Sequence, residues 1–272
     1  MLKDITIGQH FPGKSPVHML DPRLKIGITV AYVAFLFMST NAVGLILCGA
    51  MVLLFYKISN IPLKMLAKSL KPIIPLVFFT VILNLFFISG TGEPLLSLWK
   101  IKIYKEGIMF CLVMVARIIF LISGTSLLTY TTSPISLTDG LEQIMKPLNV
   151  VHFPSHEMAM MMTIALRFIP TLIEETDKIM SAQKSRGAML DSGSFMERIK
   201  ALVPILIPLF ISAFRRADEL ATAMECRCYR GGEGRTRLKQ LKITKSDVFS
   251  TIFCVIFFAI IYSTRFYFPQ VI

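Results

Sequence analysis

Charged residues are scarce in this sequence. They make up 17% of its 272 residues, whereas apolar residues make up 54%. Soluble domains carry roughly 25% charged residues, and disordered chains combine low hydrophobicity with high charge, so both classes are excluded. Acidic residues are the scarcest, with 17 Asp and Glu against 29 Lys and Arg, which gives a formal net charge of +12. The composition therefore indicates a membrane protein whose positive charges are confined to parts of the chain.

A disulfide framework and a regular metal-ligand spacing are also missing. The five cysteines are an odd number with irregular spacing: three lie in apolar runs, and Cys226 and Cys228 flank an arginine. We therefore expect ordinary thiols and no metal site. Residues 1–20 contain no continuous apolar stretch, so the N-terminus does not read as a signal peptide.

Catalytic and nucleotide-binding motifs are absent from the sequence. It contains no phosphate-binding loop of the Gly-x-x-x-x-Gly-Lys-Ser/Thr type, no His-Glu-x-x-His, no nucleophile elbow and no paired carboxylates within an apolar run. We therefore expect a protein that is not an enzyme and holds no cofactor. A nucleic-acid role is also disfavoured, because the most basic segment, 131–247, contains 13 acidic residues as well.

Five apolar runs are present, at 26–38, 42–56, 73–89, 107–130 and 248–264. A membrane span needs about 20 apolar residues, which the last three runs reach with their flanks. The first two are shorter and are separated by Ser39-Thr40-Asn41, so they predict a helical hairpin, with one long kinked helix as the alternative. Arg117 is the charged residue inside a run, and we expect it to bond a backbone carbonyl or a polar neighbour.

Two further segments, 155–187 and 195–230, carry apolar residues at helical spacing together with many charges. They predict two long amphipathic helices, bent or broken locally at Pro170, Pro204 and Pro208. The apolar faces of such helices must be covered by the protein's own spans, by lipid or by another protein.

The placement of the charges favours five spans with the N-terminus inside. In that topology 24 of the 29 Lys and Arg lie on the cytoplasmic side, whereas spans at 156–173 and 199–214 would double the positive charges outside from 4 to 8. The predicted fold class is an all-α, polytopic membrane protein with about five transmembrane helices and a cytoplasmic domain of long amphipathic helices. Three domains are predicted. They are an N-terminal membrane domain of four helices (1–130), a cytoplasmic domain with the long helices (131–246) and a C-terminal transmembrane helix (247–272).

The ends of the two long helices share one pattern. Ser185-Arg186-Gly187 and Cys226-Arg227-Cys228 each place an arginine between two small residues. Small neighbours allow a partner surface to approach closely, and the guanidinium offers a rigid fork of donors to carboxylates. Cations favour any helix C-terminus, which would explain one such arginine. The repetition of the pattern favours a docking function.

With these two motifs the sequence resembles the T component, the transmembrane scaffold subunit, of energy-coupling factor (ECF) transporters. The matching segments are 15–25, which contains Asp21-Pro22-Arg23, the two helical segments 165–170 and 215–221, and the two arginine motifs. One departure is Cys226-Arg227-Cys228, because the idealised form of that motif is Ala-Arg-Gly.

The resemblance implies a non-catalytic subunit in the cell membrane of a prokaryote, with the N-terminus and the coupling domain in the cytoplasm. Its implied partners are two cytoplasmic ABC ATPase subunits, each of which takes one arginine motif, and one small membrane subunit that captures a vitamin or a metal ion. The ATPases hydrolyse ATP, and the two long helices act as coupling helices that reorient the substrate-binding subunit. Asp21, Pro22 and Arg23 form a structural motif.

Other residues are assigned from their positions on the long helices. Met158, Met161 and Met162 are expected to form an adaptable surface for the substrate-binding subunit, with ordinary core filling as the alternative. Charged residues are expected to support the coupling helices, and they are Arg167, Arg215, Asp218, Glu219 and Glu225. Within this set, Arg215 has the spacing for intrahelical pairs with Asp218 and Glu219.

A second function from another class is a stand-alone membrane assembly or insertion factor. In that case the basic amphipathic region would lie on anionic lipid, and no ATPase would be retained. This reading gives no reason for the two arginine motifs.

Overall fold

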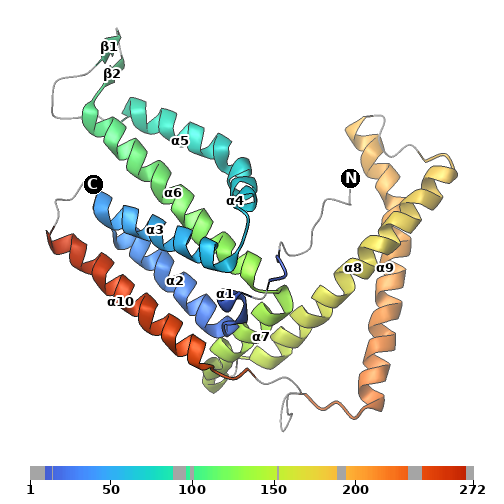
Figure 1. Ribbon diagram of the computed structural model, residues 1–272. Coiled ribbons are helices and arrows are strands. Elements are labelled where there is room, and N and C mark those ends of the chain that lie inside the picture. The colour runs from blue at the N-terminus through green and yellow to red at the C-terminus, as the bar shows by residue number, and fades with distance from the viewer. Residues whose placement is uncertain are drawn as a thin grey trace. The chain divides into compact units, whose positions relative to one another are not determined.

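The computed structural model describes residues 10–13, 15–87, 96–98, 101–151, 153–188, 194–231 and 241–267, and these are almost entirely helical (Figure 1). The exception is an antiparallel hairpin of two short strands, β1 (Leu96–Leu98) and β2 (Ile101–Ile103). The expected all-α class is thus confirmed, with this small addition. The chain divides into two compact units, which we call the membrane unit (Gly8–Gly140 and Gln240–Ile272) and the long-helix unit (Leu141–Lys239).

The membrane unit is built from short and long helices in sequence order. They are α1 (Pro16–Met19), α2 (Pro22–Met38), α3 (Ala42–Ser59), α4 (Leu63–Leu70), the 3-10 helix η2 (Lys71–Ile73), α5 (Ile74–Phe87), α6 (Lys105–Thr131), the first part of α7 (Pro134–Met145) and α10 (Lys245–Tyr267).

Four segments within the described residues are long and apolar enough to cross a membrane. They are Ala42–Ser59, Leu63–Leu85, Gly107–Thr131 and Lys245–Tyr267. The expected number was about five, and the difference is α2, which has 17 residues. At 1.5 Å per residue this helix is about 26 Å long, shorter than a hydrocarbon core of about 30 Å.

The first two apolar runs form separate helices, so the prediction of two helices is confirmed and one long kinked helix is wrong. Ser39, Thr40 and Asn41 separate α2 from α3. The third run also differs from its prediction. The candidate span starts at Leu63 and includes α4, η2 and α5, whereas positions 88 and 89 of the expected run lie outside the described residues.

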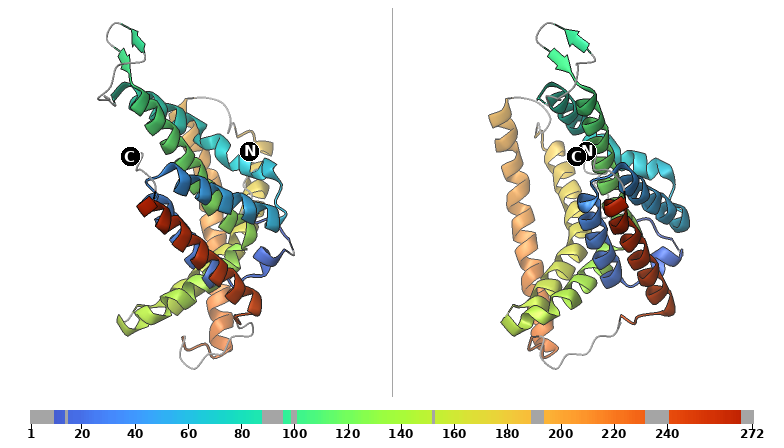
Figure 2. Two further views of the ribbon diagram at one scale, coloured as in Figure 1. Left: turned by 60° about the vertical axis from the view of Figure 1, so that its left-hand side comes forward. Right: turned by 90° about the vertical axis from the view of Figure 1, so that its left-hand side faces the viewer.

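The core of the membrane unit lies between α2, α3, α6 and α10, and Figure 2 shows α10 alongside α2. Two buried tyrosines bridge it: the Tyr32 hydroxyl donates to the carbonyl of Phe120 at 3.1 Å, and the Tyr56 hydroxyl donates to that of Ser123 at 3.1 Å. The Tyr32 ring lies so close to Gly124 that any Cβ there would collide with it. Close packing therefore explains this glycine in the middle of α6.

Arg117 has the structural role that its position in an apolar run suggested. Its Nη2 donates to the carbonyl oxygen of Ser39 at 2.8 Å. Ser39 is the C-cap of α2, where the last carbonyls of a helix lack partners in the helix itself. Arg117, in the middle of α6, thus supplies a hydrogen-bond donor to a carbonyl at the end of α2.

The long-helix unit contains the rest of α7, the 3-10 helix η3 (Lys146–Val151), α8 (Ser155–Ser185) and α9 (Phe195–Cys226). The helices α8 and α9 have 31 and 32 residues and cross each other (Figure 1). Pro170, Pro204 and Pro208 lie inside continuous helices, so of the expected local bends or breaks, the breaks do not occur.

Candidate functional site: two helix ends and a helix crossing

The end of α8 is a Schellman motif with Arg186 at the C-cap. Gly187 follows in the left-handed region, with φ at 87°. Its N–H donates to the carbonyl of Lys184 at 3.0 Å, and the N–H of Ala188 donates to that of Gln183 at 3.0 Å. These two bonds satisfy carbonyls that the last turn leaves free, and glycine is the residue that adopts the left-handed conformation most easily.

The end of α9 repeats this geometry with Arg227 at the C-cap. The N–H of Cys228 donates to the carbonyl of Glu225 at 2.8 Å, and the N–H of Tyr229 donates to that of Met224 at 3.1 Å. Cys228 takes the left-handed conformation, with φ at 55°, although this conformation costs a residue with a side chain about 1–2 kcal/mol. The expected helix over 195–230 therefore ends earlier, at Cys226.

Both arginines thus occupy the same position in the same kind of helix end. They are exposed, as are their small neighbours Ser185, Gly187 and Cys226. Within the described part of the chain, neither Arg186 nor Arg227 forms an ion pair. Each guanidinium is therefore available to a carboxylate of another molecule, and the small neighbours leave room for that molecule to approach.

An ion pair joins the two long helices. Nη2 of Arg216 on α9 lies 2.8 Å from Oε2 of Glu175 on α8. The ion pairs found among the described residues do not include the expected intrahelical pairs of Arg215 with Asp218 and Glu219. All three side chains are exposed, where such pairs gain only about 0.2–0.5 kcal/mol. The stiffening contact between the helices comes from the neighbouring arginine.

A second contact between the helices depends on proline. Nε2 of Gln183 on α8 donates to the carbonyl oxygen of Pro204 on α9 at 3.3 Å. Pro208 lies four residues later and has no N–H, so this carbonyl has no donor in its own helix. Neither Gln183 nor Glu175 was predicted from the sequence to have a role. The spacing of the two prolines was the signal that an outside donor is needed.

The other residues assigned to the long helices lie mainly on the surface. Arg167 and Glu225 are exposed, like Arg215 and its acidic neighbours. Of the three methionines, Met161 and Met162 are exposed by 58% and 43%, whereas Met158 is half-buried. Exposed apolar side chains also follow α9, and they include Leu202, Val203, Leu206, Ile207, Phe210, Ile211 and Phe214.

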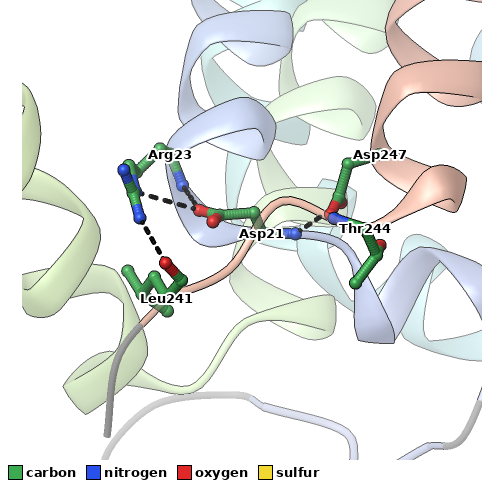
Figure 3. A network of polar contacts seen from close by, with 5 residues as sticks. All are labelled: Asp21, Arg23, Leu241, Thr244 and Asp247. Carbon is green, nitrogen blue, oxygen red and sulfur yellow. Dashed lines mark hydrogen bonds and ion pairs between the residues drawn. The ribbon is translucent and has the colours of Figure 1, made fainter.

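The Asp21-Pro22-Arg23 motif starts α2 and joins it to the start of α10 (Figure 3). Asp21 is the N-cap, and its Oδ1 accepts from the N–H of Arg23 at 2.9 Å. The N–H of Asp21 donates to Oδ1 of Asp247 at 2.8 Å, and Nη2 of Arg23 donates to the carbonyl of Leu241 at 3.0 Å. The motif therefore fixes two chain segments that are far apart in sequence.

Asp247 was not singled out in the sequence, although a signal for it exists. Its Oδ2 accepts from both the N–H and the hydroxyl of Thr244, each at 2.7 Å. Thr244 precedes α10 and Asp247 is its third residue, which is the spacing of a capping box.

Lys25 is a buried cation beside this network. Its Nζ donates to the carbonyls of His18 at 3.1 Å and Thr131 at 3.0 Å, and to the hydroxyl of Thr132 at 3.3 Å. Burial lowers the pKa of Lys25 to about 8, against the opposing effect of the carboxylates of Asp247 and Asp21. The ammonium thus connects α1, α2 and the end of α6.

Comparison with known proteins agrees with this architecture. The family model CbiQ, described as cobalt transport protein, matches residues 13–238. The energy-coupling factor transporter transmembrane protein EcfT of Clostridium kluyveri is 54% identical over 253 residues, which cover 93% of each chain. EcfT of Ruminiclostridium cellulolyticum is 53% identical over 94% of this chain and 96% of its own. EcfT of Bacillus subtilis is 43% identical over 97% of this chain and 100% of its own.

The extent of these matches and the apolar helices lead to one conclusion. The chain is a multi-pass membrane protein, and it belongs to the CbiQ family, as a transmembrane component of an energy-coupling factor transporter.

Proposed function

We propose that this subunit couples two cytoplasmic ABC ATPase subunits to a small substrate-binding membrane subunit, for uptake of a vitamin or another micronutrient. The observation that carries the proposal is the pair of matching helix ends. Arg186 and Arg227 each cap a helix, are exposed and have small neighbours. Two equivalent docking points suit two related ATPase subunits.

In this proposal each ATPase subunit binds one helix end in a groove that contains carboxylates. The guanidinium forms charge-assisted hydrogen bonds there, which are shorter and stronger than neutral ones. The small residues beside it, such as Ser185 and Cys226, let the groove close over the helix end. ATP is hydrolysed in the partner subunits, and this chain contributes no catalytic group.

Force passes between the helix ends and the membrane through α8 and α9. The two contacts between these helices, Arg216 with Glu175 and Gln183 with Pro204, hold the helices together while the ATPases move. A movement at either arginine is then transmitted along helices about 46–48 Å long.

The substrate-binding subunit docks on the apolar surface of the long helices. Met161 and Met162 are exposed, and methionine packs well against partners of different shape. The apolar side chains along α9 extend this surface, and an exposed apolar patch of this kind typically marks an interaction site.

The proposed orientation places the N-terminus and residues 131–246 in the cytoplasm of a bacterium. It requires α2 to cross the membrane as a fifth span, and it rests on the distribution of charge in that five-span topology, with 24 of 29 Lys and Arg on one side. In this scheme residues 1–130 and 247–272 form the membrane domain, and the coupling domain lies between them.

The test is co-purification with the ATPase pair from native membranes. Arg186→Glu and Arg227→Glu should each weaken retention, and the double variant should abolish it, because a broken, desolvated charge contact costs about 2–5 kcal/mol. Arg265→Glu is the matched control, since it changes the same charge at an exposed arginine in the last turn of α10. Full recovery of both ATPases with the double variant would refute the docking assignment.

The alternative of a stand-alone assembly or insertion factor predicts a different outcome. In that case the unmodified chain itself retains no ATPase, and its basic region binds anionic vesicles in a salt-dependent way. The relatives named as transporter proteins favour the coupling function.

A further inference from the structure

The short helix α4 and its C-cap carry three lysines on one face. Lys64, Lys68 and Lys71 follow each other at spacings of four and three residues, and all three are exposed. Residues at this spacing project from the same side of a helix. The three ammonium groups therefore form one continuous stripe, which we call the lysine stripe.

The other face of α4 is fixed to α6, so the direction of the stripe is determined within the membrane unit. The Tyr130 hydroxyl donates to the carbonyl of Met65 at 3.1 Å, and it also bonds the hydroxyl of Ser69. Met65 and Leu66 pack against the core. Because α4 is held by this face, its lysines point away from the core.

Among the residues that the structure describes, no acidic group pairs with the stripe. The sequence contains no Asp or Glu between Asp21 and Glu93. Within the described residues the three lysines form no ion pair, and a further exposed lysine, Lys57, lies in the last turn of α3. The charge of the stripe is therefore left to an anion from outside the chain.

The stripe borders directly on an apolar surface. At Pro72 the chain turns from α4 into α5, and Figure 1 shows the change of direction. Exposed side chains of α5 follow at once, and they include Ile74, Leu76, Phe78 and Phe79, exposed by 59–67%. A basic helix face beside an exposed apolar segment matches the boundary between lipid headgroups and acyl chains.

We propose that Lys64, Lys68 and Lys71 bind the phosphate of an anionic phospholipid headgroup, while its acyl chains lie along α5. Positive side chains near an anionic membrane surface contribute about 1 kcal/mol each, and ammonium groups are good partners for phosphate. In the orientation proposed above, this site lies in the cytoplasmic leaflet, where it holds the membrane unit at a defined depth.

The experiment measures binding of phosphatidylglycerol to the purified full-length chain by native mass spectrometry, with phosphatidylcholine as the reference. The variant Lys64→Gln, Lys68→Gln, Lys71→Gln should bind phosphatidylglycerol between about 5-fold and about 100-fold more weakly, depending on how many lysines contribute fully. Phosphatidylcholine binding should not change. The variant with arginine at all three positions should retain binding.

The charge-matched control is Lys146→Gln, Lys200→Gln, Lys242→Gln, which removes three exposed lysines elsewhere. Equal losses in the control and the stripe variant, or no loss in either, would overturn the proposal. Displacement of the lipid by a moderate excess of inorganic phosphate would overturn it as well, because the site would then serve a soluble anion. Single Lys→Gln variants keep the test decisive if the triple variant does not fold, since each should show part of the loss.

Discussion

The side chain of Gln183 on α8 donates a hydrogen bond to the backbone carbonyl of Pro204 on α9. This carbonyl lacks a donor in its own helix, because the residue four positions later is a proline. The distance between Nε2 and the carbonyl oxygen is 3.3 Å. This contact depends on Pro208 four residues later, because any other residue there would supply the missing N–H. One contact between α8 and α9 thus has a chemical cause in the sequence of α9.

The first prediction follows from that cause. Gln183→Leu should destabilise the packing of α8 on α9 by up to about 1 kcal/mol, the contribution of one hydrogen bond. In a Pro208→Ala background the helix supplies its own donor, so the same substitution should have almost no effect. Thermal unfolding of the four proteins in detergent measures this cycle. An equal loss in both backgrounds would show that the proline is irrelevant to the contact.

The second prediction concerns the ion pair between the long helices. A double-mutant cycle with Arg216→Gln and Glu175→Gln should give a coupling energy of about 0.5–1 kcal/mol, since both side chains are partly exposed, by 33% and 23%. The matched cycle with Arg215→Gln and Asp218→Asn should give a value near zero, because these exposed side chains form no pair. A larger coupling in the second cycle would reverse the assignment.

The third prediction concerns the left-handed residue after α9. Cys228→Gly should stabilise the helix end by about 1 kcal/mol, because glycine adopts a positive φ without steric cost. The amide of Tyr229, which donates to Met224, should then exchange with deuterium about five-fold more slowly. Gly187→Ala at the equivalent position of α8 should have the opposite effect on the amide of Ala188. Faster exchange of the Tyr229 amide in Cys228→Gly would show that the left-handed conformation of Cys228 does not strain this helix end.

The fourth prediction concerns Lys25, which precedes the apolar run 26–38. Burial lowers its pKa from the ordinary value of 10.5 to about 8, so between these values the unfolded chain binds the proton and the folded chain does not. Stability should therefore rise with pH across this window, by at most about 1.4 kcal/mol per pH unit. Melting temperatures from pH 7 to pH 10 measure the slope.

Lys25→Met should remove this part of the slope, whereas Lys242→Met, at an exposed position, should leave it unchanged. An identical slope in Lys25→Met and the unmodified protein would show that another group titrates.

The sequence contained enough information for the helices but not for their side-chain partners. Apolar runs and helical periodicity located α3, α6, α8, α9 and α10 to within a few residues, because these patterns reflect burial and lipid contact directly. The end of α9 was placed too late, since a cysteine is a poor signal for a left-handed residue. Arg117 was correctly expected to bond a backbone carbonyl.

The contacts between segments could not be predicted in the same way. Arg215 and Arg216 are neighbours of identical chemistry, and only the rotation of α9 against α8 decides that Arg216 reaches Glu175. Likewise, nothing local in the sequence shows that Asp21 meets Asp247, because the two lie 226 positions apart. Such pairings depend on tertiary packing rather than on periodicity.

The bond between Asp21 and Asp247 also has a consequence for the order of synthesis. A ribosome adds about 5–20 residues per second, so the 226 positions between them take roughly 11–45 seconds to make. During that interval the start of α2 lacks the carboxylate to which the backbone N–H of Asp21 donates in the finished protein. The network around Asp21, Arg23 and Lys25 is therefore completed only when the final helix enters the membrane, and a chain truncated before residue 247 leaves it open.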